Sequence, residues 1–172
     1  MERNIHQPSE ILGELNNKLR QELDQHNKKS TDGMDVAFCK IAFKDGQCDE
    51  LTFAGAKRPM LIYHQCIGKL EIIEGDKKGV GGFANDDSKI FTDKILKICK
   101  GDLLFLYSDG IIDQQNPARD RFGTSNFTKI LNERIDEPMI KIKEFVEKAF
   151  DGHKAFEDQR DDITVLGLRL IS

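Results

Sequence analysis

The spacing of hydrophobic residues divides the chain into a helical start, a strand-rich middle and a helical region before the last strand. Leucines recur at intervals of three and four after the helix-start signal Pro8-Ser9-Glu10. This spacing predicts one amphipathic helix over about residues 8–25. From residue 36 the hydrophobic period changes to two, which predicts a strand over residues 36–43 that ends at the hairpin turn Asp45-Gly46.

The middle of the chain contains short apolar runs that alternate with turn residues. They predict strands at residues 51–54, 61–64, 70–73, 89–91, 95–99 and 103–107. We expect the first three of these to continue an antiparallel meander, because no helical pattern separates them. The glycine-rich stretch at residues 75–87 is expected to be a long surface loop.

Two helices and one strand are predicted in the last third of the chain. Thr124 and Pro138 each provide a helix start ahead of apolar residues at helical spacing. The final run, residues 163–171, has apolar residues at odd and even positions, which predicts a central strand covered on both faces. The element order predicts an α+β fold in a single domain over residues 1–172, a four-layer α/β/β/α sandwich of two largely antiparallel sheets flanked by helices.

Charge and cysteine content exclude several classes of protein. The chain has 26 Lys and Arg against 30 Asp and Glu, a formal net charge of -4 and a pI near 5.6, which argues against nucleic acid as the main partner. No apolar run reaches the roughly 18 residues that a membrane-spanning helix needs, so we expect a cytoplasmic domain without membrane contact. The four cysteines form no CxxC pair and are expected to be reduced core residues: Cys39, Cys48, Cys66 and Cys99.

Two acidic clusters lie at the ends of hydrophobic strands. Ser108-Asp109-Gly110 follows the run at residues 103–107, and Asp161-Asp162 precedes the run at residues 163–171. Carboxylates held at the ends of buried strands are suited to binding a hard divalent cation. For either cluster taken alone, turn chemistry is the favoured explanation, since Asp and Gly end strands in any fold.

Four stretches, in a fixed order, resemble the motifs of one protein family. They are residues 32–37 (DGMDVA), 53–59 (FAGAKRP), 100–115 (KGDLLFLYSDGIIDQQ) and 158–164 (DQRDDIT). Together they extend over nearly the whole chain. They resemble the bacterial metal-dependent serine/threonine phosphatases of the sporulation stage II E type, a branch related to the type 2C protein phosphatases.

This resemblance implies a site with two Mn²⁺ or Mg²⁺ ions, bridged by an activated water and held by aspartates at strand ends. It implies that Asp109 and Asp161 are ligands of one of these ions, and that Gly110 lets the backbone turn tightly beside the ligand. Asp162 is expected to serve the adjoining turn, and a direct metal role stays open. Residues 113–121 correspond to a regulatory helix-loop region of the family.

The chain departs from the family pattern at its start. The resemblance calls for an acidic strand and an Asp-x-x-Gly-His-Gly type segment upstream of residues 8–12, and the sequence contains no Gly-His-Gly. We therefore expect the carboxy-terminal two thirds or so of a phosphatase domain, incomplete at its amino terminus. Without the bridging aspartate we expect at most one weak ion site and little or no phosphatase activity. Uncovered sheet edges would favour self-association, for example as a homodimer.

Two functions of different classes follow from the sequence. The first is a phosphatase output domain of a bacterial signalling protein, normally preceded by a sensory domain, that dephosphorylates a regulatory protein such as an anti-sigma-factor antagonist. The second is a non-catalytic, degenerate phosphatase fold that binds a partner. Asp109 and Asp161 favour the first function for the parent protein, because a binding module has no physical need for carboxylates at both strand ends. The absent upstream segment favours the second for this chain.

Overall fold

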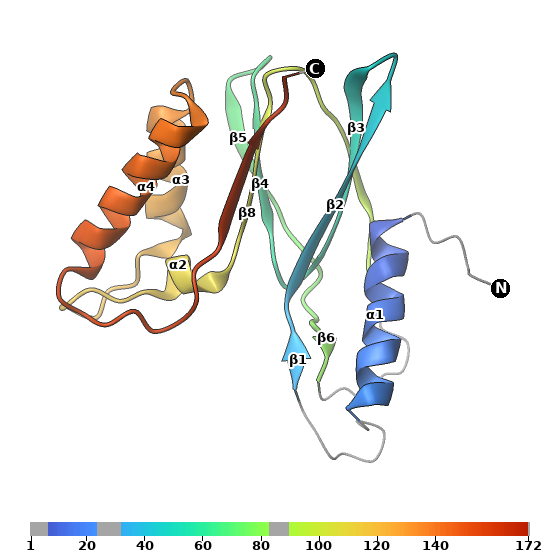
Figure 1. Ribbon diagram of the computed structural model, residues 1–172, viewed down its shortest axis with the longest axis horizontal. Coiled ribbons are helices and arrows are strands. Elements are labelled where there is room, and N and C mark those ends of the chain that lie inside the picture. Colours follow the sequence, from blue (N-terminus) through green and yellow to red (C-terminus); the bar gives the residue numbers. More distant parts are fainter. Residues whose placement is uncertain (1–6, 24–31, 83–89, 172) are drawn as a thin grey trace.

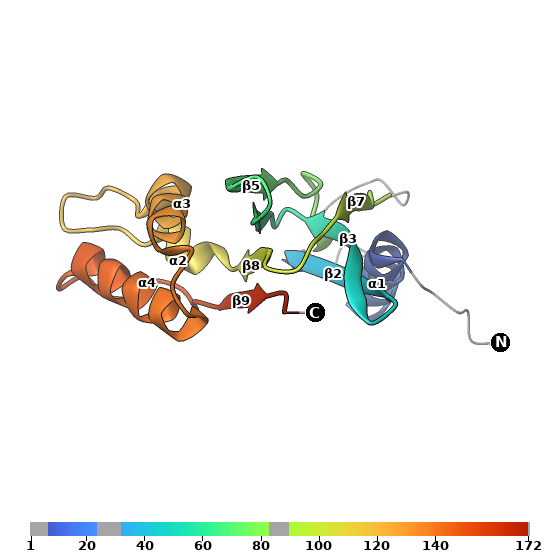
Figure 2. The same ribbon diagram turned by 90° about the horizontal axis from the view of Figure 1, so that it is seen from above.

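The computed structural model describes residues 7–23, 32–82 and 90–171, and its elements form four layers (Figure 1). The first layer is helix α1 (Pro8–Glu22), and the last is formed by α2 (Asp109–Asp113), α3 (Gly123–Arg134) and α4 (Met139–Lys154). Seen from above, α1 and the pair α3 and α4 lie at opposite ends of the molecule, with the sheets between them (Figure 2). The expected α/β/β/α sandwich is confirmed.

The two inner layers are antiparallel sheets. The sheet next to α1 has the strand order β2-β3-β7. Its strands are β2 (Val36–Lys44), β3 (Gln47–Ala56) and β7 (Lys94–Lys97). The sheet next to α3 and α4 has the order β5-β4-β8-β9. Its strands are β4 (Met60–His64), β5 (Lys69–Ile73), β8 (Leu103–Tyr107) and β9 (Val165–Arg169).

Three apolar clusters fill the spaces between the four layers. Leu12 of α1 packs with Ala54, Ala56, Val80 and Phe91 between this helix and the first sheet. Phe53 from one sheet and Ile62 from the other lie in the cluster between the two sheets. The third cluster joins Phe105 of β8 to buried residues of α3 and α4, among them Phe127 and Val146. Each interface between layers is therefore filled by buried apolar side chains.

The first helix begins at Pro8, the first residue of its sequence signal, as predicted. Gln7 is the N-cap, and the carboxylate of Glu10 accepts a hydrogen bond of 3.3 Å from the Gln7 backbone N–H. Ser9 instead donates its hydroxyl to Asp93 at 2.6 Å, which ties the helix to the segment before β7. The helix ends at Glu22, and the expected residues 24–25 lie outside the described part of the chain.

The prediction of a continuous meander is wrong between β3 and β4. These strands belong to different sheets, so the chain crosses the sandwich at residues 57–59. Lys57 has a left-handed backbone, with φ of 59°, and the following Arg58-Pro59 pair favours an extended chain. Hydrophobic alternation fixes which side of a strand is buried, but it does not say which sheet the strand joins.

One further strand prediction and one loop prediction are corrected. Ile90 and Phe91 are not in a strand, and Lys89 lies outside the described residues. Phe91 lies in a loop, and its side chain is buried in the apolar cluster that also contains Leu12 of α1. Within the predicted loop at residues 75–87, β6 (Val80–Gly81) pairs with β1 (Gly33–Met34), while residues 83–87 lie outside the description.

The last strand is an edge strand, where a central strand was predicted. Among the described strands, β9 pairs only with β8. Its side chains Val165, Leu166 and Leu168 are 38%, 49% and 43% exposed. The apolar residues on both faces of β9 are thus present, but the described part of the chain covers them only in part. The hydrophobic pattern shows which residues the strand contains. A strand is central only if it has a neighbouring strand on each side, and the pattern does not show this.

The cysteine prediction is confirmed for one residue and wrong for two. Cys48 is buried, and Cys39 is half-buried. Cys66 and Cys99 are exposed because each lies in a turn at the end of the second sheet. These two turns are joined by the buried carboxylate of Asp102, which accepts hydrogen bonds of 2.9 Å from the backbone N–H groups of Gln65 and Cys99.

Candidate functional site at the end of strand β8

The site is built where β8 ends and α2 begins. Ser108 is the N-cap of α2, and Asp109 is its first residue. The sequence predicted only a turn here, because a helix of five residues carries too little periodicity to be recognised. Ile111 is 2% exposed and packs into the cluster below α3 and α4. This buried anchor holds the short helix, and with it Asp109, against the end of the sheet.

The loop that carries Asp161 is tied directly to this helix start. The hydroxyl of Ser108 donates to the Asp162 carbonyl at 3.1 Å and accepts a hydrogen bond of 2.9 Å from the Thr164 N–H. The Ser108 N–H donates to the Thr164 carbonyl at 2.9 Å. The two acidic clusters, 52 positions apart in sequence, are thereby brought to one place. These three bonds fasten the loop after Asp161 to the start of α2.

Gly110 is required for a reason different from the one expected. Its φ is not among the positive values of this chain, so no unusual turn depends on it. A Cβ placed there would overlap the Asp162 carbonyl oxygen, far inside van der Waals contact. The missing side chain lets the Asp161–Asp162 loop pass directly over the start of α2.

Arg58 joins Asp109 to an acidic residue of the other sheet. Its Nη2 donates to Asp109 Oδ2 at 2.6 Å and lies 3.1 Å from Asp35 Oδ2. Lys57 Nζ lies 3.6 Å from the other oxygen of Asp35. The Arg58 side chain is 19% exposed, and those of Asp35 and Asp109 are 26% and 42% exposed. A partly buried guanidinium therefore bridges carboxylates at the start of β2 and at the end of β8.

These groups line an open polar pocket of about 550 Å³. Asp35, Asp109 and Asp161 contribute carboxylates, Arg58 contributes a cation, and Ser108 and Thr164 contribute hydroxyls. Asp162 is not one of the lining residues; its N–H donates to Asp161 Oδ1 at 2.8 Å, and its carbonyl accepts from Ser108. The structure thus brings Asp109 and Asp161 to one pocket and places Asp162 in the adjoining turn.

Tyr107 forms part of the apolar side of this pocket. Its ring packs edge-on against Phe127, with ring centroids 5.1 Å apart. Burial, followed by the nearby charge of Glu74, raises the pKa of the Tyr107 phenol above its ordinary value. The phenol is therefore neutral at physiological pH and brings no further charge to the aspartates.

The donor chemistry of the pocket suits a hard divalent cation, but the arrangement of the donors does not. Carboxylate oxygens are the ligands that Mg²⁺ and Mn²⁺ prefer. Yet within residues 7–23, 32–82 and 90–171, no three His, Cys, Asp or Glu side chains are grouped so that they could hold an ion. The Asp109 carboxylate already has a cationic partner, the guanidinium of Arg58. As arranged, these residues do not form an ion site.

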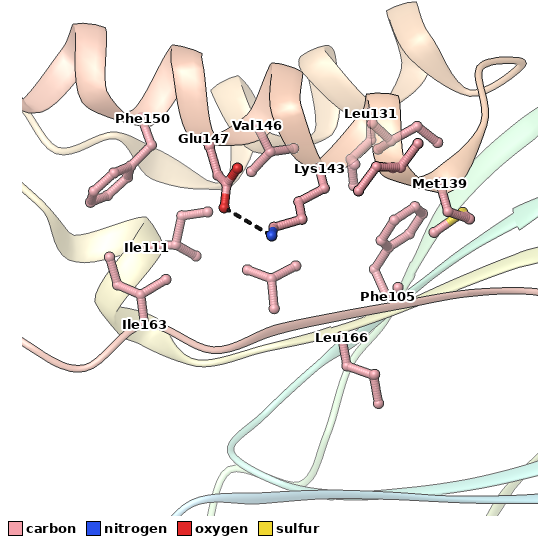
Figure 3. Close-up of a pocket in the computed structure, with 14 residues that line it drawn as sticks. Phe105, Ile111, Leu131, Met139, Lys143, Val146, Glu147, Phe150, Ile163 and Leu166 are labelled. Atoms are coloured by element: carbon pink, nitrogen blue, oxygen red, sulfur yellow. Dashed lines mark ion pairs between the residues drawn. The ribbon is translucent and has the colours of Figure 1, made fainter.

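A second, apolar pocket lies between α4 and the strands β8 and β9 (Figure 3). Ile111 and Ile163 lie side by side in it near Phe150, and Lys143 and Glu147 form an ion pair of 3.5 Å above them. Each isoleucine follows a candidate aspartate by two positions, Ile111 after Asp109 and Ile163 after Asp161. The lining of the apolar pocket therefore includes one side chain close in sequence to each candidate aspartate.

Two charged residues of the polar pocket were not predicted from the sequence. Asp35 and Arg58 both lie inside stretches that carried the family resemblance, but the resemblance assigned no role to their side chains. The available signal was the Lys57-Arg58-Pro59 string, where two cations interrupt an otherwise apolar strand pattern. Only the crossing between the sheets shows that this string meets Asp35 and Asp109.

Solved structures with the same fold come from several bacterial proteins. The SiaA-PP2C domain of Pseudomonas aeruginosa matches with a TM-score of 0.79 and 23% identity over 95% of this chain and 61% of its own. The RsbU and RsbW domains of a Mycobacterium tuberculosis protein match with a TM-score of 0.71 and 15% identity, over 96% of this chain and 42% of theirs.

A third match is the phosphatase domain of the cell fate determinant SpoIIE from Bacillus subtilis, presoaked with Mn. Its TM-score is 0.57 at 13% identity, over 99% of this chain and 77% of that one. This chain spans 61% of the SiaA-PP2C domain, which is less than two thirds of its length. A comparison with curated proteins gives no match.

None of the helices in the described segments is long and apolar enough to cross a membrane. The family model described as Stage II sporulation protein E (SpoIIE) matches residues 1–171. The chain therefore belongs to the stage II sporulation protein E family, whose fold is that of the type 2C protein phosphatases.

Proposed function

We propose that the polar pocket belongs to the active site of a protein serine/threonine phosphatase. The observation that carries this proposal is the convergence of Asp109 and Asp161, from two separate strand ends, on one open polar pocket. Family membership supports the same reaction class. In this proposal the domain is the cytoplasmic output part of a bacterial signalling protein. Its substrate is a phosphorylated regulatory protein, such as an anti-sigma-factor antagonist.

The proposed ion ligands are Asp109 and Asp161, and the ion is Mn²⁺ or Mg²⁺. A hard divalent cation takes six or more oxygen ligands, so water and groups outside the described residues would complete the shell. Gly110 acts by allowing the loop to approach, and Asp162 by shaping the turn. Because the described residues supply an incomplete set of ligands, we propose that this chain alone binds the ion weakly and hydrolyses phosphate esters at or near background.

Calorimetric titration with Mn²⁺, with hydrolysis of a phosphoserine peptide followed in the same samples, tests this proposal. Asp109→Asn and Asp161→Asn should each abolish the weak Mn²⁺ binding of the unmodified chain. Asp113→Asn is the matched control, because Asp113 is an exposed aspartate of the same short helix whose carboxylate pairs with Arg121 at 2.9 Å. Binding that survives both site variants, or that is lost equally in the control, would contradict the assignment.

A second candidate function is a non-catalytic module that binds a partner protein. The observation that favours it is the pairing of Asp109 with Arg58, since a carboxylate neutralised within the chain needs no ion. This candidate predicts no Mn²⁺ binding that depends on Asp109 or Asp161. The same titration therefore separates the two functions.

A further inference from the structure

Two exposed cysteines with free thiols meet at one end of the second sheet. Cys66 lies in the turn between β4 and β5, and Cys99 lies in the turn between β7 and β8. Their thiols share a side-chain hydrogen bond, although the two residues are 33 positions apart in sequence. Because both residues are exposed, a small reagent can reach the pair from solvent.

The backbone holds the two turns against each other. The strands β4 and β8 are antiparallel neighbours whose pairing stops at these turns, and a Cβ at Gly101 would lie 3.1 Å from the Gln65 side chain. One oxygen of the buried Asp102 carboxylate accepts a hydrogen bond of 2.9 Å from the Gln65 N–H, and the other accepts one of 2.9 Å from the Cys99 N–H. Gln65 directly precedes Cys66. A single carboxylate therefore fixes the backbone beside both thiols, and the sulfurs meet without any movement of the backbone.

We propose that Cys66 and Cys99 form a reversible oxidation site, in which a low-molecular-weight disulfide converts the two thiols into an intramolecular disulfide bond. The bond would join covalently the two turns that Asp102 already joins through hydrogen bonds. Neither cysteine lines the polar pocket, and Asp109 lies at the other end of β8. The oxidation site is therefore separate from the proposed active site and does not depend on its chemistry.

The reaction takes place by two thiol–disulfide exchanges. In the first, the Cys66 thiolate attacks one sulfur of the reagent, forms a mixed disulfide and releases one molecule of the reagent's thiol. Cys66 attacks first because the hydrogen bond to Cys66 and its nearby charge raise the pKa of Cys99, which keeps the Cys99 thiol protonated. In the second, Cys99 loses its proton to solvent, attacks the Cys66 sulfur and releases the second thiol. The protein loses two electrons and two protons, and the reagent gains them as two thiols.

The test uses oxidised glutathione as the reagent, added to the folded chain at low protein concentration after reduction with dithiothreitol and removal of that reductant. Mass spectrometry of the intact protein should show the loss of two hydrogen atoms and no retained glutathione. Peptide mapping should place the new bond between Cys66 and Cys99. Free thiols, counted after unfolding in urea, should fall from four to two, and dithiothreitol should restore all four.

Single variants separate the two exchanges. Cys66→Ser and Cys99→Ser should each retain one glutathione and form no internal bond, because the thiol needed for the second exchange is missing. Cys48→Ala is the control, since Cys48 is buried in the cluster between the sheets. It should form the same bond at a rate within about twofold of the unmodified chain. Far-ultraviolet circular dichroism shows whether each variant is folded.

An internal bond that the unmodified chain forms, and that both serine variants lose, supports the oxidation site. A glutathione adduct that persists on the unmodified chain would overturn it, because Cys99 would then be unable to reach Cys66. A bond between two copies of the chain, or one that involves Cys39 or Cys48, would also overturn it. The same holds if the folded chain keeps all four thiols in the presence of oxidised glutathione.

Discussion

At the site, close contacts between backbone segments restrict which residue a position can hold as much as charge does. Gly110 lies where the loop carrying Asp161 crosses the start of α2, and the atom that an added Cβ would meet first is a backbone oxygen that cannot turn away. Neither the charge nor the hydropathy of the sequence marks such a position. It follows that the geometry of Asp109 depends on a residue with no side chain.

Replacement of Gly110 by alanine should therefore destabilise the protein by about 1–3 kcal/mol, because the backbone must move to relieve the overlap. Gly152→Ala is the matched control: it lies in α4, where an added Cβ meets nothing within 4 Å. The control should be neutral or stabilising by roughly 0.5–1 kcal/mol, because alanine favours helix. Urea unfolding measures both changes. Equal stabilities of the two variants would refute the close-approach role.

At the scale of elements, the sequence predicted whether a segment is a helix or a strand better than it predicted where that segment lies in the fold. The first helix, the β2–β3 hairpin and the strands β4, β5 and β8 follow from hydrophobic period and turn residues, and all are present. The sheet to which a strand belongs, and whether it lies at an edge, depends on contacts between distant segments that no local pattern records. The same limit explains the site. Asp109 and Asp161 were found because they end apolar runs, whereas Asp35 and Arg58 meet only across the two sheets.

Thiol reactivity tests the placement of strands and turns. Burial in β2 raises the pKa of Cys39 to about 12, so at pH 8 only about one part in ten thousand is the reactive thiolate. Cys66 and Cys99 are exposed and should react first with a thiol reagent. A hydrogen bond to Cys66 raises the pKa of Cys99, so Cys99 should be the slower of the two.

Serine variants identify each thiol in this experiment. Cys66→Ser and Cys99→Ser should each remove one fast-reacting equivalent at pH 8, and Cys39→Ser should remove none until urea unfolds the protein. Because the thiolate is the reactive form and the pKa of Cys99 is raised, the rate at Cys99 should rise as pH increases from 7 to 9. Fast labelling of Cys39 in the folded protein would show that β2 is not placed as described.

At the scale of the whole molecule, one side of the sandwich has uncovered apolar side chains. Leu166 and Leu168 of β9 oppose Leu106 and Leu104 of β8, which belong to or pack against the cluster between the sheets. They are 49% and 43% exposed. An antiparallel pairing of β9 with β9 of a second copy, centred on Gly167, would set Leu166 opposite Leu168 of that copy. Such pairing would satisfy the free edge and cover the apolar face.

We expect this pairing to produce a homodimer in solution, observed by light scattering and sedimentation across a range of concentrations. Leu168→Lys should weaken it at least about tenfold, because a charge would be placed in an apolar contact. Ile67→Lys is the control, since Ile67 is 69% exposed in the turn between β4 and β5. A monomer at every concentration, or equal effects of the two variants, would exclude the β9 contact.

The apolar pocket under α4 has a consequence for how this domain tolerates change. Ile111 and Ile163 share that pocket with Phe150 and Val146, and each isoleucine stands two positions after an aspartate of the site. Side chains close in sequence to both aspartates therefore line the same apolar pocket. Substitutions on the buried face of α4 should therefore disturb the geometry of the polar pocket, although these residues do not line it.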